Sequence, residues 1–187
     1  VDLVSTIGFA ADPGQAREMC IRLSDFLRNT LRLGERTSIP FGDELALVRT
    51  YLDVEQVRFG SRLRVEQDIG ELCDRCVVPP LLLQPLVENA VKHGIASLVD
   101  GGFIRIRAHV SNEVLRVSVE NDFDPDNPSP KRSGLGLANV RNRIETRHGN
   151  RGHMNVAVTG TLHRVDLELP CERAAAEVPA RSVISHA

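Results

Sequence analysis

The sequence lacks several features that would place it in common functional classes. Its 187 residues contain no run of about 18 apolar residues, so no segment is expected to span a membrane. The first ten residues lack a basic stretch and do not read as a signal peptide. The net charge of −2 provides no basic field for nucleic acid. These absences leave a globular domain of ordinary composition that is not expected to bind nucleic acid.

Cysteine is also scarce, and the spacing of the four cysteines gives little support for a metal site. Cys73 and Cys76 form a C-x-x-C pair, but no second C-x-x-C or H-x-x-H follows at zinc spacing. We therefore interpret the cysteines as reduced thiols, with this pair in a turn of a cytosolic protein.

Two amphipathic helices are predicted in residues 1–60. The first begins after Asp12, ends at Gly34 and carries one apolar stripe at helical spacing. That stripe consists of Ala16, Met19, Cys20, Leu23, Leu27 and Leu31. The second helix, 43–59, carries two apolar lines, which are Leu45, Val48 and Leu52, and Leu47, Tyr51 and Val54. Two lines indicate packing on both sides, as in a bundle or a dimer interface, although plain core packing would give the same pattern.

After residue 60 the pattern alternates between strands and helices. We expect a short strand near 63–69, a helix opened by Pro79-Pro80 and closed by Gly94, and a helix over 137–148. Two hairpins are predicted, one over 103–119 and one over 154–169, followed by a frayed tail after Pro170. Hairpins with helices on one face predict an α+β two-layer sandwich with a mixed sheet, preceded by a helical hairpin.

The first chemical motif lies on the predicted helix 79–94 and reads Glu88-Asn89-Ala90-Val91-Lys92-His93-Gly94. Asn89, Lys92 and His93 stand at i, i+3 and i+4, so they share the helix face opposite the leucines. Oxygen ligands suit Mg²⁺, and lysine supplies a positive charge to phosphates. The pattern fits a metal-chelated polyphosphate, and an ordinary solvated polar face would also show it.

The second motif is Ser133-Gly134-Leu135-Gly136-Leu137-Ala138-Asn139, in which glycines lead directly into a helix. Glycine lets backbone N–H groups approach an anion at a helix N-terminus, where the helix dipole also favours negative charge. The motif is neither a Rossmann fingerprint nor a P-loop, because G-x-G-x-x-G and G-K-[ST] are both missing. The polar loop 122–133 before it has the length of a mobile lid.

Together the two motifs resemble those of the LytS-type sensor histidine kinases. The likeness runs through 82–94, a hairpin and 134–144, and covers about residues 15–170. The catalytic domain of these kinases belongs to the GHKL superfamily of gyrase, Hsp90, histidine kinase and MutL. The resemblance therefore implies a Bergerat-type ATP-binding fold with ATP and Mg²⁺ as cofactors.

The resemblance also implies roles for individual residues. Asn89 matches the Mg²⁺ ligand of the family, and Lys92 and His93 match residues beside the phosphates and the ribose. Glu88 is the implied catalytic residue, which would polarise a water or the attacking imidazole. The phosphate-binding box matches Gly134, Leu135, Gly136 and Leu137, and Asn139 and Arg143 lie one helical turn apart within reach of the triphosphate.

The adenine box departs from the family's pattern. After the strand 115–119 most relatives have Asp-x-Gly-x-Gly, whose aspartate accepts a hydrogen bond from the adenine amino group. Here Asn121 stands in the place of that aspartate, and Phe123 and Pro125 replace the glycines. The carbonyl of Asn121 can still accept a hydrogen bond, but a weaker one because it is uncharged.

The implied function is transfer of the γ-phosphate of Mg-ATP to a histidine outside this chain. All six histidines lie at or after position 93, so residues 1–60 hold no acceptor. We expect 1–60 to be a partial dimerisation and phosphotransfer segment, 61–170 the ATP-binding domain and 171–187 a tail. Two alternatives stay open: a pseudokinase interaction module with a degraded adenine pocket, and a GHKL-type ATPase in which Glu88 activates water.

The resemblance further implies partners and a location. A homodimer through the N-terminal helices and a response regulator are the expected partners. The expected location is the cytoplasm, including the cytoplasmic part of a membrane-anchored sensor.

Overall fold

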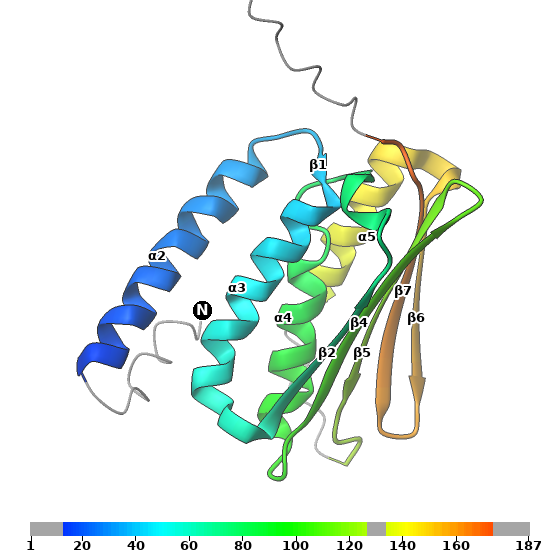
Figure 1. The fold of residues 1–187 in the computed structure, drawn as a ribbon. Coiled ribbons are helices and arrows are strands. Elements are labelled where there is room, and N and C mark those ends of the chain that lie inside the picture. The colour runs from blue at the N-terminus through cyan, green and yellow to red at the C-terminus, as the bar shows by residue number, and fades with distance from the viewer. Residues whose placement is uncertain (1–12, 127–133, 174–187) are drawn as a thin grey trace, which may run out of the picture.

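A computed structural model describes residues 13–126 and 134–173 of the chain (Figure 1). The helices are α2 (Pro13–Gly34), α3 (Phe41–Phe59), α4 (Gln84–His93) and α5 (Gly134–His148). The main sheet contains β2 (Leu63–Ile69), β4 (Gly102–Ser111), β5 (Val114–Asp122), β6 (His153–Thr159) and β7 (Leu162–Pro170). A small sheet pairs β1 (Ile39–Pro40) with β3 (Val77–Val78). None of the described helices is both long and apolar enough to cross a bilayer.

The main sheet has the strand order β2-β4-β5-β7-β6, with β2 parallel to β4 and every other pair antiparallel. Asn112 and Glu113 form the tight turn between β4 and β5, and both have a positive φ, as a type I′ hairpin turn requires. Helices α3, α4 and α5 cover one face of the sheet, and no described helix covers the other face (Figure 1). The predicted α+β two-layer sandwich with a mixed sheet is confirmed.

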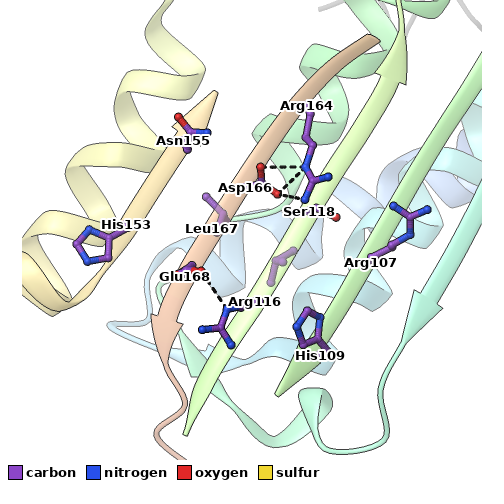
Figure 2. Close-up of a pocket in the computed structure, with 11 residues that line it drawn as sticks. Arg107, His109, Arg116, Ser118, His153, Asn155, Arg164, Asp166, Leu167 and Glu168 are labelled. Carbon is purple, nitrogen blue, oxygen red and sulfur yellow. Dashed lines mark hydrogen bonds and ion pairs between the residues drawn. The ribbon is translucent and has the colours of Figure 1, made fainter. Parts of the chain in front are cut away.

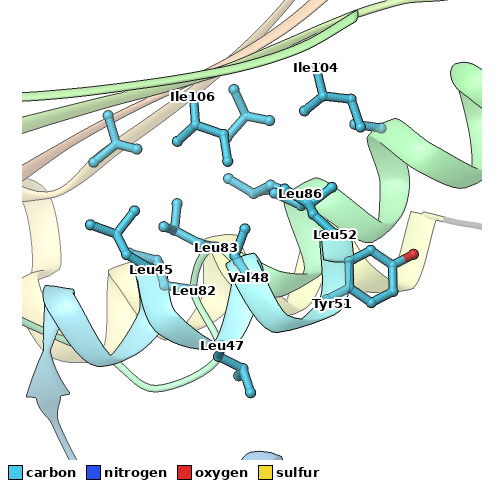
Figure 3. Packing of buried hydrophobic residues seen from close by; sticks show 14 of the residues in the cluster. Leu45, Leu47, Val48, Tyr51, Leu52, Leu82, Leu83, Leu86, Ile104 and Ile106 are labelled. Atoms are coloured by element: carbon cyan, nitrogen blue, oxygen red, sulfur yellow. The ribbon is translucent and has the colours of Figure 1, made fainter. Parts of the chain in front are cut away.

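Helix α3 packs on both of its sides, as its two apolar lines predict. Leu45, Val48 and Leu52 point toward the sheet, where Ile104 and Ile106 meet them (Figure 3). The other line points away from the sheet, and Tyr51 packs against Phe26 of α2 with the ring centroids 5.9 Å apart. The hydrophobic core is therefore continuous from α2 through α3 to the sheet, and it crosses the boundary expected at residue 60.

Helix α2 buries only part of its apolar stripe. Met19, Leu23 and Phe26 are buried, whereas Leu27 and Leu31 are 50% and 72% exposed and Cys20 is exposed. The predicted helix is confirmed, and its apolar residues are divided between a buried side and an exposed side. In the described residues α2 packs mainly on α3, so one side of the helix is buried and the other is exposed.

Helix α4 begins at Gln84, five residues after the start predicted at Pro79. The side chain of Glu44, on α3, explains the difference, because its carboxylate accepts the backbone N–H groups of Leu81, Leu82 and Leu83. Leu81 has a φ of 55°, which no helix allows. Glu44 is fully buried; burial raises the pKa of its carboxyl group, while the backbone hydrogen bonds act to lower that pKa.

Two predictions that concern the C-terminal end of the sheet are wrong. Cys76 forms a disulfide with Cys171, so these two cysteines are not reduced thiols. Residues 171–173 are not part of a frayed tail, because the N–H of Val77 donates to the carbonyl of Glu172 at 2.7 Å and the carboxylate of Glu172 pairs with Arg147 at 2.9 Å. A cross-link over a sequence separation of 95 residues leaves no local pattern in the sequence.

We expect Glu44→Gln to destabilise the fold, because an amide places its NH₂ group against N–H donors that a carboxylate accepts. The free energy of unfolding should fall by about 2–4 kcal/mol, as for buried hydrogen bonds to a charged group. Urea denaturation measures this change. The matched control is Asp43→Asn on the same helix, and equal effects of the two substitutions would contradict the role of Glu44.

Candidate nucleotide-binding site

The end of α4 meets the end of β5, and Gly94 makes this contact possible. A Cβ atom at position 94 would clash with Asn121 Nδ2 and with the carbonyl oxygens of Ala90 and Asp122. The backbone of the first motif therefore lies directly against the residues of the expected adenine box. Asn89 and His93 are half-buried near this junction, and Lys92 is exposed.

Asn121 lies on the face of the sheet that the helices cover. It is 3% exposed and pairs across the sheet with Ile104 on one side, a fully buried residue. Its Nδ2 donates to the carbonyl of Asp122 at 2.9 Å, which leaves the side-chain oxygen for another donor. The carboxylate of Asp122 is engaged elsewhere, because it accepts the backbone N–H of Phe103 in β4 at 3.0 Å.

A second histidine, which the sequence analysis did not select, lies beside His93. His163 pairs with Asn121 across β5 and β7, so both side chains occupy the same face of the sheet. Burial lowers the pKa of His93, and Lys92 lowers it further. Burial also lowers the pKa of His163, with a smaller contribution from His93. The Nε2 atom of His93 is buried and has no hydrogen-bond partner among the described residues.

Glu88, the expected catalytic residue, bonds within its own helix. It is half-buried, and its Oε1 accepts a hydrogen bond from Gln84 Nε2 at 2.6 Å. The pKa of Tyr51 on α3 is raised mainly by burial, then by the carboxylates of Glu55 and Glu88. The carboxylate of Glu88 is therefore near enough to Tyr51 on α3 to affect its pKa.

The phosphate-box residues open α5 beside the start of α4. A Cβ atom at Gly136 would lie 3.8 Å from the Cβ of Pro85, so the two helix starts are in van der Waals range. Leu135 is 75% exposed and Leu137 is half-buried. The end of the expected lid, residues 127–133, lies outside the described residues.

Asn139 and Arg143 lie away from the junction of α4 and β5. Arg143 donates to the carbonyl of Leu81 at 2.7 Å. Both residues line a groove of about 520 Å³ together with Arg36, Pro79 and Pro80. Arg143 would have to leave its bond to Leu81 to reach a triphosphate at the first motif.

The open face of the sheet holds a second hollow, of about 560 Å³, that no sequence motif predicts (Figure 2). Its charges are largely paired: Arg116 with Glu168 at 3.0 Å and Arg164 with Asp166 at 2.7 Å. The nearby Glu120 is 4% exposed and contacts three arginines, Arg105, Arg107 and Arg164. Paired charges stabilise a solvated sheet face and leave few donors for a ligand.

Comparison with known proteins gives one consistent family. A family model described as histidine kinase matches residues 3–63. The sensor histidine kinase BtsS of Escherichia coli K12 is 34% identical over 160 residues, which cover 85% of this chain and 28% of BtsS. The sensor protein LytS of Enterococcus faecalis is 31% identical over 176 residues, covering 87% of this chain and 30% of LytS. The chain thus spans less than a third of the length of these relatives.

Solved structures show the same fold. The histidine kinase domain of the blue-light activated kinase EL346 from Erythrobacter litoralis has a TM-score of 0.55 at 18% identity, covering 91% of both chains. Full-length ShkA in complex with AMPPNP has a TM-score of 0.52 at 19% identity, covering 87% of this chain and 38% of ShkA. The chain therefore belongs to the LytS-type histidine kinases, and its sheet and helices have the GHKL fold.

The buried histidines give a testable pH dependence. Burial lowers the pKa of His148 below its ordinary value of 6.5, and both of its ring nitrogens lack partners among the described residues. Arg147 and Arg151 add to this lowering, and Glu172 opposes it. The unfolded chain then binds more protons than the folded chain between the two pKa values, so stability falls as the pH drops below about 6.5.

We expect His148→Gln to reduce this loss of stability. Thermal unfolding between pH 7.5 and 5.5 measures it, with the exposed His109→Gln as the matched control. An unchanged pH dependence in His148→Gln would contradict the assignment.

Proposed function

We propose that this chain is the ATP-binding catalytic part of a sensor histidine kinase, which transfers the γ-phosphate of Mg-ATP to a histidine outside residues 1–187. The observation that carries the proposal is the contact between α4 and β5 at Gly94. This contact joins the end of α4, the helix that carries Asn89, Lys92 and His93, to the strand that carries Asn121. A metal, phosphate and base site would then share one end of the helix-covered face. ShkA, which has the same fold, was solved in complex with AMPPNP, and this supports nucleotide binding by the fold.

The donors at this junction fit a magnesium-bound nucleotide. Asn89 offers an amide oxygen, a ligand type that Mg²⁺ accepts, and Mg²⁺ would supply neutralisation of phosphate charge. Lys92 is exposed and offers a mobile positive charge to the same phosphates. The partnerless Nε2 of His93 is a buried polar atom for which a ligand hydroxyl or phosphate oxygen would provide a partner.

The other residues would orient the nucleotide and the acceptor. The side-chain oxygen of Asn121 would accept a hydrogen bond from the adenine amino group. The start of α5 at Gly134 would direct backbone N–H groups and the positive end of the helix dipole toward the phosphates. Glu88, the residue before Asn89 on α4, would polarise the acceptor imidazole. Positioning and charge neutralisation supply most of the catalysis in phosphoryl transfer.

The adenine box supports a second candidate function, a pseudokinase interaction module. Asn121 carries no charge and already uses its amide nitrogen for the carbonyl of Asp122. Phe123 replaces a glycine, and its N–H donates to the carbonyl of Thr161 at 2.9 Å, which extends the ladder between β5 and β7. A titration with Mg-ATP distinguishes the candidates, because only the kinase requires nucleotide binding.

A dimer through α2 and a response regulator partner belong to the same proposal. The exposed face of α2 presents Ile21, Leu27 and Leu31, which are 44%, 50% and 72% exposed. An apolar stripe on a helix that packs on one side alone is suited to pairing with a second copy. The proposal of a response regulator as a partner rests on family membership alone.

We expect the chain to bind Mg-ATP or Mg-ADP with a Kd in the micromolar to millimolar range, about −8 to −4 kcal/mol. Asn89→Ala should weaken this binding at least about tenfold, by ~1.4 kcal/mol, while circular dichroism stays unchanged. Isothermal titration calorimetry measures both values. The control is Asn155→Ala, an exposed asparagine on the open sheet face. Equal affinities in the two variants would exclude the metal role of Asn89.

We expect no phosphohistidine on this chain. Residues 1–60 contain no histidine, and phosphoryl transfer tolerates little misplacement of the acceptor. Incubation with γ-labelled ATP, followed by acid and base treatment, tests this expectation. A base-stable, acid-labile label on the chain alone would place the acceptor among its six histidines.

A further inference from the structure

The disulfide between Cys76 and Cys171 closes a loop around most of the ATP-binding fold. The two Cα atoms are 5.0 Å apart, and the sequence separation is 95 residues. The enclosed chain contains the first motif on α4, the phosphate box on α5 and every strand of the main sheet except β2. A change at this bond therefore acts on both motifs through the backbone.

Cys76 is a junction for three parts of the fold. Its carbonyl accepts the N–H of Phe41, the first residue of α3, at 2.8 Å. Its neighbour Val77 bonds to Glu172, and Cys76 forms a β-bridge with Arg173. The disulfide therefore fixes residues 171–173 alongside the segment that leads into α4.

Glu172 extends this junction to α5. Its carboxylate pairs with Arg147 at 2.9 Å and lies 3.8 Å from Arg151. The N–H of Cys171 donates to the carbonyl of Glu113, in the turn between β4 and β5, at 2.8 Å. Separation of Cys171 from Cys76 would leave residues 171–173 held by these contacts and by the backbone pairing with Cys76 and Val77, with no covalent link.

We propose that Cys76 and Cys171 form a reversible thiol–disulfide site that takes a dithiol reductant as its substrate. Cys171 is partly exposed, whereas Cys76 is fully buried, so attack on the Cys171 sulfur is the accessible route. A thiolate of the reductant bonds to Cys171, and Cys76 leaves as a thiolate and takes up a proton. The second thiol of the reductant then displaces Cys171 as a thiol and forms the oxidised reductant, so two electrons and two protons reach the cysteine pair.

The bond re-forms by the reverse exchange with a disulfide oxidant. It also re-forms with hydrogen peroxide: the two thiols give up two electrons and two protons, and the peroxide is reduced to two molecules of water. The third nearby cysteine, Cys73, is fully buried, and burial raises the pKa of its thiol. A protonated buried thiol is a poor nucleophile, so Cys73 does not compete for the bond. Cys73 is therefore expected to stay a thiol during the exchange.

Opening the bond releases residues 171–173 and loosens the segment 77–83 that positions α4. This consequence for nucleotide binding rests on the proposed function, because it acts through Asn89 on α4. The chemical and structural steps do not rest on it, since they concern the cysteine pair and the backbone around it alone.

The test uses the native chain with and without dithiothreitol, followed by denaturation and labelling with N-ethylmaleimide. We expect two labels before reduction, on Cys20 and Cys73, and four afterwards. Hydrogen exchange should become faster at 77–83 and 171–173 in the reduced chain, and Tm should fall by about 5–15 °C. Hydrogen peroxide should restore the two-label state.

Cys171→Ser should reproduce the reduced state without dithiothreitol, and Cys20→Ser, which removes the exposed free thiol, should change neither exchange nor Tm. Four labels in the chain that was exposed to peroxide and not reduced would overturn the proposal. Two labels after treatment of the native chain with dithiothreitol, with four only when reduction follows denaturation, would also overturn it. Unchanged exchange at 77–83 and 171–173 after reduction would overturn it too.

Mg-ATP affinity in the two redox states separates this proposal from the proposed function. We expect binding to weaken about fivefold on reduction. Absence of binding in both states would refute the proposed function, while the label counts and exchange rates would still decide the thiol–disulfide site. Equal affinities in both states would overturn the coupling to α4.

Discussion

The carboxylate of Glu44 is the contact on which the arrangement of the helical layer depends. It accepts three consecutive backbone N–H groups, at Leu81, Leu82 and Leu83, across a sequence separation of 37 to 39 residues. These donors precede α4, where the chain cannot satisfy them through its own helix. A negative charge at this position also complements the positive end of the α4 dipole. Glu44 therefore holds the segment that leads into α4, the helix that carries Asn89 and His93.

The two faces of the sheet differ in the residues that they carry. The covered face carries the core and, at one end, the junction of Gly94, Asn121 and His163. The open face carries Glu120 and its arginines, whose charges are satisfied within the sheet. The family relationship and the fold are established by the comparisons, and the nucleotide site is proposed on the covered face, where polar groups such as His93 Nε2 remain without partners.

Local patterns in the sequence predicted much of the fold. The alternation in β4 and β5 and the two apolar lines of α3 are short-range features, and the structure contains both. The predicted start of α4 was wrong because Glu44 resembles any acidic residue in the first turn of a helix, and its hydrogen-bond partners are distant in sequence. The disulfide was missed for a related reason: Cys76 has a neighbour at Cys73, but its partner is Cys171. Nothing in the sequence placed His163 near the site, because the register between β5 and β7 cannot be read from one sequence.

Nuclear magnetic resonance titration with Mg-ADP tests the central claim most directly, because it reports on each amide separately. The proposed site predicts shifts at 89–94, at 121–123 and at 134–137, the three segments that would surround one nucleotide. Amides at 107, 116 and 164 on the open face should stay unchanged. Shifts confined to the open face, or to the groove beside Arg36, would contradict the claim that the junction of α4 and β5 binds the nucleotide.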